Sequence, residues 1–445
     1  MGERPGSGDG PPVADVESVF DIAAVRRDGE ALYYLGTPLA SAETLERELW
    51  PLFHDAGYEV SLSTRAQVDG VIGAEGPSTH AADPSARTDG PSTPADGPSP
   101  PTDGSGVSPG GGPGPTDGPV PTNGAGRRFD PVRPQYVLVA EPRTPHIDGV
   151  PWTNLVFFVM TVFSTLLVGT QWYYIRVQSP LDLLAAWPFA AAILGVLAVH
   201  EMGHYVMIRH YDVDASLPYF IPFPSLIGTM GAVIRMRGRI PSRKALFDIG
   251  VAGPLAGLVA TVVVTVIGLY LDPIAVPEWV RDGSGTTIRF NYPLLLQGLA
   301  VLTSQPLSYP DPEVAANPVI FGGWVGMFVT FLNLIPVGQF DGGHVLRATL
   351  GPRQETVAAA VPAALFGLAG YLYVFADATN AVILWAFWGV IAIALAYAGP
   401  ATPVRDDPVG PRRKAVGALT LVLGLLCFTP VPIEINPAWV GVGLL

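Results

Sequence analysis

Long apolar runs dominate the chain after residue 150, whereas the preceding residues mix apolar and polar positions. Most runs have about the 20 residues that an α-helix needs to cross the hydrocarbon core of a bilayer. They predict a membrane α-helical protein with about six to seven transmembrane helices. In chain order the runs are Trp152–Tyr174, Leu183–Ile208, Leu246–Leu271, Val319–Ile335, Val357–Phe375, Ala381–Ala398 and Ala415–Phe428, the last being the shortest. Leu294–Leu302 is shorter still, so we expect it to be re-entrant or interfacial.

Alternating apolar and polar positions near the N-terminus predict four short strands and one helix. Ser41 is a suitable N-cap for a helix that ends by Ala56, although Pro51 can kink it or end it early. The strands are expected at Val19–Arg26, Glu30–Leu35, Tyr58–Leu62 and Tyr136–Ala140. Together these elements predict a small α+β domain, residues 13–65 and 128–142, which buries only a modest core.

Residues 66–127 separate the third and fourth predicted strands and differ from them in composition. They are rich in Gly, Pro, Ser, Thr and Asp, and Asp-Gly-Pro recurs from Asp89, Asp96 and Asp117. Such a composition buries too little apolar surface to offset the entropy of ordering, so we predict a disordered insert within the α+β domain. The alternative is a plain linker, with Tyr136–Ala140 belonging to another part of the fold.

Charge and composition narrow the class of partner and the compartment. The net charge is −13, and Lys244 and Lys414 are the only lysines, a balance that resembles proteins of extreme halophiles. Phosphate contacts need a basic surface, so nucleic acid is not an expected partner. A single cysteine, Cys427, excludes an internal disulfide. Met1–Gly10 lacks the apolar core of a signal peptide, which favours a cytoplasmic N-terminal domain.

Basic residues between the apolar runs predict the orientation in the membrane. The loop that follows Leu183–Ile208 carries six basic residues between Arg209 and Lys244. The longer loop Asp272–Pro318 carries only two. With a cytoplasmic N-terminus, all the basic loops fall on the cytoplasmic side. Residues 200–204 would then lie toward the cytoplasmic end of their helix.

The sequence His-Glu-Met-Gly-His at residues 200–204 follows the apolar run Phe189–Val199. On a helix, positions four apart lie on one face, so His200 and His204 can bind one zinc ion. Glu201 between them can serve as general base toward water. Ionisable groups at membrane depth are costly and mark a functional site by default. The alternative is a buried polar network without a metal.

One carboxylate of the apolar half stands out as a third metal ligand. A hydrolytic zinc site takes three protein ligands and leaves a position for water. Asp341 lies in the segment 333–344 (NLIPVGQFDGGH), whose proline and glycines predict a break in the helix. Unwound backbone at membrane depth is tolerated only where it faces protein or a wet cavity. The alternative role for Asp341 is to cap a helix that starts near Gly342.

Three separated motifs resemble the site-2 protease family of intramembrane zinc metalloproteases. They are His-Glu-x-x-His at residues 200–204, Asn333-x-x-Pro336 and Asp341-Gly342, in that order. Further stretches resemble the branch found in photosynthetic organelles and many prokaryotes: residues 218–222 (PYFIP), 228–232 (GTMGA) and 247–257 (FDIGVAGPLAG). The resemblance covers roughly residues 150–400, within a membrane-embedded metalloprotease domain expected at residues 150–430. Unlike many relatives, the chain has no recognisable peptide-binding module between its helices.

The resemblance implies a zinc metalloendopeptidase that cuts within or next to a transmembrane segment of a client protein. The implied ligands of one Zn²⁺ per chain are His200, His204 and Asp341, and Glu201 is the implied general base. Asn333 is a candidate donor to the oxyanion, or alternatively a hydrogen-bonding bridge between helices.

An extended segment at residues 228–235, which includes Gly228 and Gly231, is implied to pair with an unwound substrate. The expected partners are therefore a membrane-spanning protein substrate and the lipid bilayer, with the chain a multi-pass protein of the cell membrane. Client and oligomeric state are not predicted. An inactive relative acting as a membrane scaffold is one alternative, and the intact Glu201 counts against it. A polar-site transporter is another, but only one broken apolar segment is evident.

Three further features have ordinary structural explanations. His210 and His344 are expected at the membrane interface or as supports for the ligands, not as ligands themselves. Gly253-x-x-x-Gly257 is typical of two helices in close contact.

Overall fold

The computed structural model describes residues 11, 13–64, 136–142, 150–236, 238–281, 287–376 and 378–436. The chain separates into two compact units, one holding an N-terminal sheet and the other the apolar helices. The insert predicted at residues 66–127 lies outside the described residues, and the domain boundaries remain predictions.

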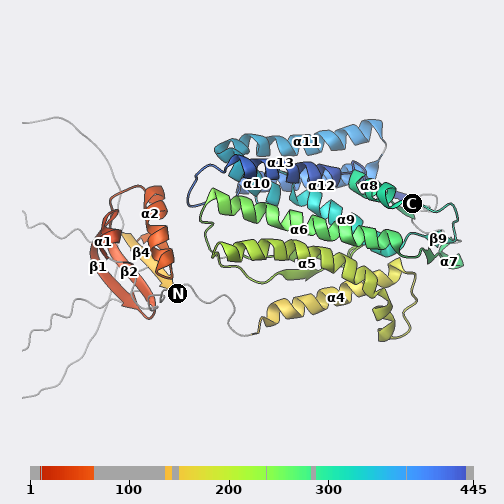
Figure 1. Ribbon diagram of the computed structural model, residues 1–445, viewed down its shortest axis with the longest axis horizontal. Coiled ribbons are helices and arrows are strands. Elements are labelled where there is room, and N and C mark those ends of the chain that lie inside the picture. Colours follow the sequence, from red (N-terminus) through yellow and green to blue (C-terminus); the bar gives the residue numbers. More distant parts are fainter. Residues whose placement is uncertain are drawn as a thin grey trace, which may run out of the picture. The chain divides into compact units, whose positions relative to one another are not determined.

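The N-terminal unit is an antiparallel sheet with a helix packed on it (Figure 1). Its elements are α1 (Val13–Glu17), β1 (Phe20–Asp28), β2 (Ala31–Pro38), α2 (Ala42–Asp55), β3 (Tyr58–Thr64) and β4 (Tyr136–Pro142). The strand order is β1-β2-β4-β3, so β4 pairs with both β2 and β3. Tyr136–Pro142 is therefore a strand of this sheet.

Local sequence accounts for α2. The Ser41 hydroxyl caps its first turn by accepting a hydrogen bond from a backbone amide at 3.4 Å. Pro51 lies inside the helix without ending it. Leu45, Leu49 and Phe53, spaced by four residues, are almost completely buried and fix the face that α2 turns to the sheet.

The second unit is built from helices, with short strand pairs in its loops (Figure 1). Its longer helices are α4 (Trp152–Trp172), α5 (Trp187–His210), α6 (Arg243–Tyr270), α8 (Leu294–Thr303), α9 (Pro318–Asn333), α10 (Asp341–Leu350), α11 (Gln354–Phe375), α12 (Thr379–Ala398) and α13 (Pro411–Leu426). A 3₁₀ helix, η1 (Pro180–Ala186), precedes α5, and η2 (Gly351–Arg353) and α7 (Glu278–Arg281) are single turns. The strand pairs are β5 (Tyr219–Pro222) with β6 (Thr229–Val233), β7 (Ile274–Ala275) with β9 (Val314–Ala315), and β8 (Thr287–Phe290) with β10 (Ile433–Asn436).

Five helical segments of the described residues are long and apolar enough to cross a membrane. They are Trp152–Trp172, Pro180–His210, Arg243–Tyr270, Asp341–Phe375 and Thr379–Ala398. The runs expected to end at Ile335 and Phe428 form α9 and α13, which have 16 residues each. The total of six to seven spanning helices therefore stays a prediction, as does their orientation. Leu294–Leu302 forms α8, a ten-residue helix whose last apolar side chains are exposed.

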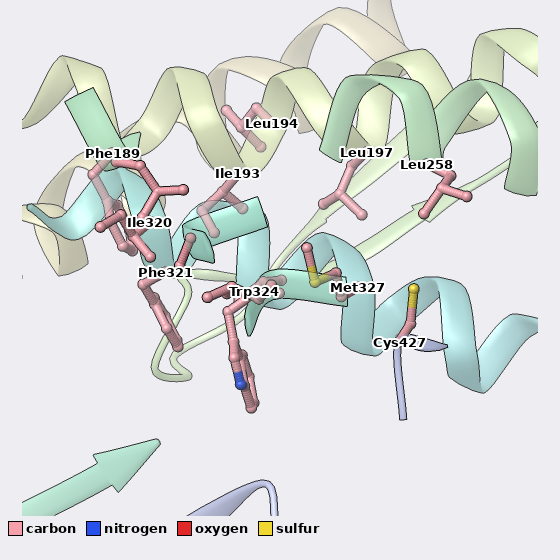
Figure 2. Close-up of a cluster of buried hydrophobic side chains, with 14 of the residues drawn as sticks. Phe189, Ile193, Leu194, Leu197, Leu258, Ile320, Phe321, Trp324, Met327 and Cys427 are labelled. Atoms are coloured by element: carbon pink, nitrogen blue, oxygen red, sulfur yellow. The ribbon is translucent and has the colours of Figure 1, made fainter. Parts of the chain in front are cut away.

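The core of this unit lies where α5, α6 and α9 meet (Figure 2). α9 contributes aromatic and apolar side chains, including Phe321, Trp324 and Met327, which pack against Ile193 and Leu197 of α5. Close approach of the helices depends on small residues, because a Cβ at Gly322, Gly323 or Gly326 of α9 would collide with α5 or α6. This packing brings the two segments that carry the predicted metal ligands together.

The predicted break in the apolar run after Asn333 is present. α9 ends at Asn333, residues 334–340 form turns, and α10 starts at Asp341. The first glycines of α10 are required by close contact, since a Cβ at Gly342 would lie 2.2 Å from the Leu334 carbonyl oxygen. Asp341 is thus held at the first turn of a helix that folds back on the end of the preceding one.

Candidate metal centre

α5 brings two histidines and a glutamate into the packed interior. His200 and Glu201 are 3% and 9% exposed. The rings of His200 and His204 lie on one face of the helix, with centroids 5.0 Å apart. The spacing predicted from the sequence therefore produces the expected arrangement of the two imidazoles.

α6 makes room for both histidine rings with two glycines at the same spacing. A Cβ on Gly253 would lie 2.0 Å from His204 Nε2, and one on Gly257 would lie 2.8 Å from His200 Nδ1. Any side chain at these positions would displace the rings. The Gly-x-x-x-Gly sequence is thus a helix-packing face, as predicted, and it also forms the wall behind the site.

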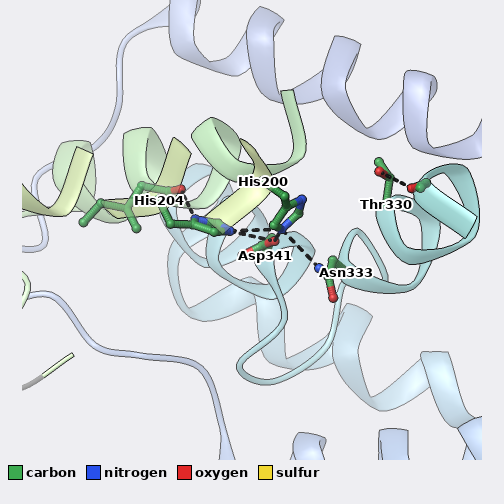
Figure 3. Close-up of polar contacts among 7 residues, drawn as sticks. His200, His204, Thr330, Asn333 and Asp341 are labelled. Carbon is green, nitrogen blue, oxygen red and sulfur yellow. Dashed lines mark hydrogen bonds and ion pairs between the residues drawn. The ribbon is translucent and has the colours of Figure 1, made fainter. Parts of the chain in front are cut away.

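Asp341 completes a cluster of three possible metal-binding atoms (Figure 3). Its Oδ2 lies 3.4 Å from His200 Nε2 and 3.2 Å from His204 Nε2, and the two nitrogens are 3.3 Å apart. Tetrahedral zinc ligands at about 2.0–2.1 Å from the metal lie about 3.3–3.4 Å from one another. The donor types and all three separations therefore fit zinc. Asp341 does not cap α10 with its side chain, because the N-cap is Phe340.

A backbone carbonyl fixes the orientation of the His204 ring. Nδ1 of His204 lies 2.9 Å from the carbonyl oxygen of Ile249, which accepts its hydrogen bond. With the proton on Nδ1, the lone pair of Nε2 is free to bind a metal, and the ring cannot rotate without losing this bond. The sequence gives no signal for this contact, because a carbonyl has no side-chain signature.

Asn333 reaches the same cluster from the end of α9. Its Nδ2 lies 3.2 Å from His200 Nε2, so the amide stands at the edge of the metal-binding atoms (Figure 3). The residue does connect two helices, as the structural alternative required. It also lines the cavity beside the cluster.

A cavity of about 240 Å³ opens beside these residues. Its wall includes Glu201, Asn333, Asp341 and His344, together with residues 232–234 at the end of β6. A water molecule needs only about 10–15 Å³ of such cavity volume, so the cavity has room for several water molecules. Glu201 thus lines the same cavity as the three clustered donor residues.

α4 holds the β5–β6 hairpin beside the cavity by side-chain hydrogen bonds to its carbonyls. Asn154, Thr161, Ser164 and Trp172 donate to the carbonyls of Leu217, Phe220, Gly228 and Leu226, at 2.5–3.0 Å. Gly228 has a φ of 76° and approaches α4 so closely that a Cβ would lie 2.6 Å from the Thr165 Cα. Gly231 also has a positive φ, of 114°, and faces open space. The importance of α4 for the site was not predicted, because its polar residues are scattered along an apolar run.

The C-terminal end of α5 is tied to two other helices by a polar network. Arg413 of α13 forms two hydrogen bonds, of 2.9 and 2.7 Å, with the carboxylate of Asp248 on α6. The hydroxyl of Tyr211, just after α5, donates to the same carboxylate. Burial, reinforced by the Asp248 carboxylate, raises the pKa of Tyr211 to about 12. The network fixes the position of α5 relative to α6 and α13.

The fold and the site define a class of protein. It is a helical membrane protein whose apolar helices carry two histidines and an aspartate, the kind of ligand set found in zinc hydrolases. Comparison with known proteins agrees. The profile of peptidase family M50 matches residues 188–374. This match, which covers less than half of the chain, and the similarities below support the site-2 protease family of zinc metalloproteases.

Several plant proteins are similar to part of the chain. It is 31% identical over 264 residues to a probable chloroplastic zinc metalloprotease EGY1 of Arabidopsis thaliana, covering 58% of this chain and 45% of that protein. It is 28% identical over 316 residues to a probable chloroplastic zinc metalloprotease EGY2 of Oryza sativa subsp. indica, covering 68% and 55%. The chain thus spans about half the length of these relatives. Among solved structures, a site-2 protease from Methanocaldococcus jannaschii is 16% identical, with a TM-score of 0.28, covering 56% of this chain and 92% of that one.

Proposed function

We propose that this protein is an intramembrane zinc metalloendopeptidase, which cleaves a peptide bond within or next to a transmembrane segment of a client protein. The observation that carries the proposal is the tetrahedral spacing of His200 Nε2, His204 Nε2 and Asp341 Oδ2, at 3.2–3.4 Å. These three residues would hold one zinc ion per chain, which would polarise a carbonyl and acidify water. The match of residues 188–374 to peptidase family M50 supports the same chemistry.

Glu201 performs the proton transfers in this proposal. It accepts a proton from the attacking water and passes it to the nitrogen of the leaving amine, so that the peptide bond breaks to give an acid and an amine. Its burial beside the cavity limits competing access by bulk solvent. The Asn333 amide donates a hydrogen bond to the oxygen that becomes negative as the carbonyl is attacked.

The substrate binds as an added strand along β6. A transmembrane helix hides its carbonyls in internal hydrogen bonds, so it must unwind before cleavage, and the freed groups need new partners. Among the described residues β6 pairs with β5 alone, and its residues Ala232 and Val233 line the cavity. Gly228 and Gly231 give the strand its local shape, and the open space at Gly231 can take a substrate side chain.

The test is Glu201→Gln in purified protein, with a labelled membrane-spanning substrate. We expect zinc content to stay at the wild-type level and cleavage to fall by about 100- to 10,000-fold, because an amide cannot accept the proton. Cleavage by Glu201→Gln at the wild-type rate would refute the mechanism. A wild-type protein that binds zinc but cleaves no membrane-spanning substrate would favour the scaffold alternative.

We further propose that the N-terminal domain and the end of α5 near His204 face the cytoplasm. The support is the basic loop between α5 and α6, whose six basic residues contrast with the two of the loop after α6. Reporter fusions in each of these loops test the orientation. A reporter in the α5–α6 loop that is active only outside the cell would reverse the assignment.

A further inference from the structure

His344 is a buried histidine of the cavity wall that the mechanism above does not use. It follows Asp341 by three residues on α10, so the two side chains lie on neighbouring positions of one helix face. It is 7% exposed and lines the same cavity as Glu201 and Asn333. The position is therefore inside the site, although the residue is not one of the three clustered donors.

The hydrogen bonding of His344 differs from that of His204. Nδ1 of His204 is satisfied by the Ile249 carbonyl, which orients the ring. Nδ1 of His344 is buried and has no hydrogen-bond partner among the described residues. A buried polar atom normally has a partner, and an exception in a native protein calls for an explanation such as a ligand or a catalytic role.

The packing around His344 fixes its backbone and Cβ firmly. A Cβ on Gly250 of α6 would lie 3.1 Å from the His344 Cβ and 3.4 Å from the Asp341 carbonyl oxygen. The absence of a side chain at Gly250 thus lets α10 approach α6 at this turn. The described residues show no hydrogen bond from His344 to His200, His204 or Asp341, so it does not support the donors in that way.

We propose that His344 is a further catalytic residue of this peptidase, donating a hydrogen bond to the substrate oxygen that becomes negative during attack. This inference rests on the proposed function. The oxygen of water bonds to the carbonyl carbon, the carbonyl π electrons move to its oxygen, and the water proton moves to Glu201. His344 stabilises the oxyanion by its N–H without giving up the proton. When the C–N bond breaks, the amine takes the proton from Glu201 and the carbonyl re-forms.

Asn333 and His344 then act as two donors from different helices. Asn333 lies at the end of α9, beside His200, whereas His344 lies one turn into α10, after Asp341. Paired donors aimed at one developing charge are a common way to stabilise a tetrahedral oxyanion. The short connection between the two helices, residues 334–340, fixes the distance between the donors' backbones.

The experiment compares His344→Phe, which removes the N–H and keeps a ring, with His344→Gln, which keeps an N–H donor. His210→Phe is the matched control, because His210 is exposed at the end of α5 and lies outside the cavity wall. For His344→Phe we expect kcat to fall by about 100- to 1,000-fold with unchanged KM and zinc content. His344→Gln should recover part of the rate, and His210→Phe should retain all of it.

A binding measurement separates oxyanion stabilisation from a structural role. A phosphinate analogue of the substrate peptide carries a tetrahedral anionic centre in place of the scissile bond. His344→Phe should bind this analogue more weakly by about the factor lost in kcat. Substrate affinity, measured with Glu201→Gln as the background to prevent cleavage, should not change. Unchanged phosphinate affinity, or a loss of zinc that accounts for the loss of rate, would overturn the inference.

The outcomes distinguish this inference from the proposal on which it rests. If the wild-type protein cleaves no membrane-spanning substrate, the proposed function fails. If the wild type is active and His344→Phe is equally active, only the role of His344 fails. If His344→Phe does not accumulate in folded form, His344→Leu replaces it. The inference then requires His344→Leu to cleave more slowly than His344→Gln.

Discussion

α6 and α4 relate to the site in different ways: α6 contacts the histidines directly, whereas α4 contacts the hairpin beside the cavity. α6 presses glycines against the rings of His200 and His204, at distances that leave no room for a Cβ. α4 holds the β5–β6 hairpin by hydrogen bonds from isolated polar side chains. In the apolar stretches of α5 and α6, 50% of the residues are buried within the protein. In the apolar stretch of α4, only 22% are buried.

The difference separates two tasks of the proposed enzyme. The metal-binding atoms need positions fixed to a few tenths of an ångström, and close packing of helices without side chains at the contact provides them. The edge that would receive a substrate must stay accessible, and within the described part of the chain β6 has no strand partner other than β5. Substitutions on the two sides should therefore have different signatures: metal affinity and rate on the α6 side, substrate affinity on the α4 side.

The largest effect on the metal side is expected from His204→Ala. Removing one of three donors should lower zinc affinity by more than the roughly 10- to 100-fold typical of residues that only support a ligand. Zinc content after dialysis and cleavage should both be lost, whereas Glu201→Gln loses cleavage alone. Asp341→Asn serves as a parallel measurement on the third donor. Wild-type zinc content in His204→Ala would contradict the ligand assignment.

A smaller effect is expected from Gly253→Ala, which adds one methyl group behind the His204 ring. The added Cβ would lie 2.0 Å from Nε2, so the ring or α6 must move. Overpacking typically destabilises a protein by about 1–3 kcal/mol. If all of this free energy is lost from zinc binding, zinc affinity falls by roughly 5- to 150-fold. Gly195→Ala on α5 is the control, since a Cβ there meets nothing within 4 Å. Equal zinc affinity in both variants would show that the wall behind the ring is not tight.

Parts of the site that depend on side-chain type and short motifs can be predicted from the sequence, whereas parts that depend on helix packing cannot. His200, Glu201, His204 and Asp341 carry their chemistry in their side chains and in short motifs, so their residue types and spacing were sufficient to select them as candidates, and three of them do cluster. The Ile249 carbonyl and the clearance at Gly253 depend on how α5 and α6 pack, which no local pattern states. His344 was expected only as a support, because its unsatisfied nitrogen is visible only in three dimensions.

In the fold, too, local features could be predicted from the sequence and features that depend on tertiary contacts could not. The apolar runs predicted the long helices to within a few residues at most ends, since both length and hydropathy are local properties. α1 is too short to give a periodic signal. The pairing of β8 with β10 joins segments more than 140 residues apart, and it was not predicted because sheet partners depend on the tertiary fold.

On the α4 side, Ser164→Ala should weaken substrate binding while leaving the metal site intact. Its hydroxyl donates to the Gly228 carbonyl at 2.5 Å, next to the start of β6. Loss of one such hydrogen bond costs about 0.5–1.5 kcal/mol, which corresponds to roughly a 2- to 13-fold rise in KM if strand β6 positions the substrate. Thr170→Val is the matched control, because that hydroxyl donates to Leu167 within α4 itself. An unchanged KM in Ser164→Ala, or a loss of zinc as large as in Gly253→Ala, would mean that α4 and α6 do not divide the two tasks in this way.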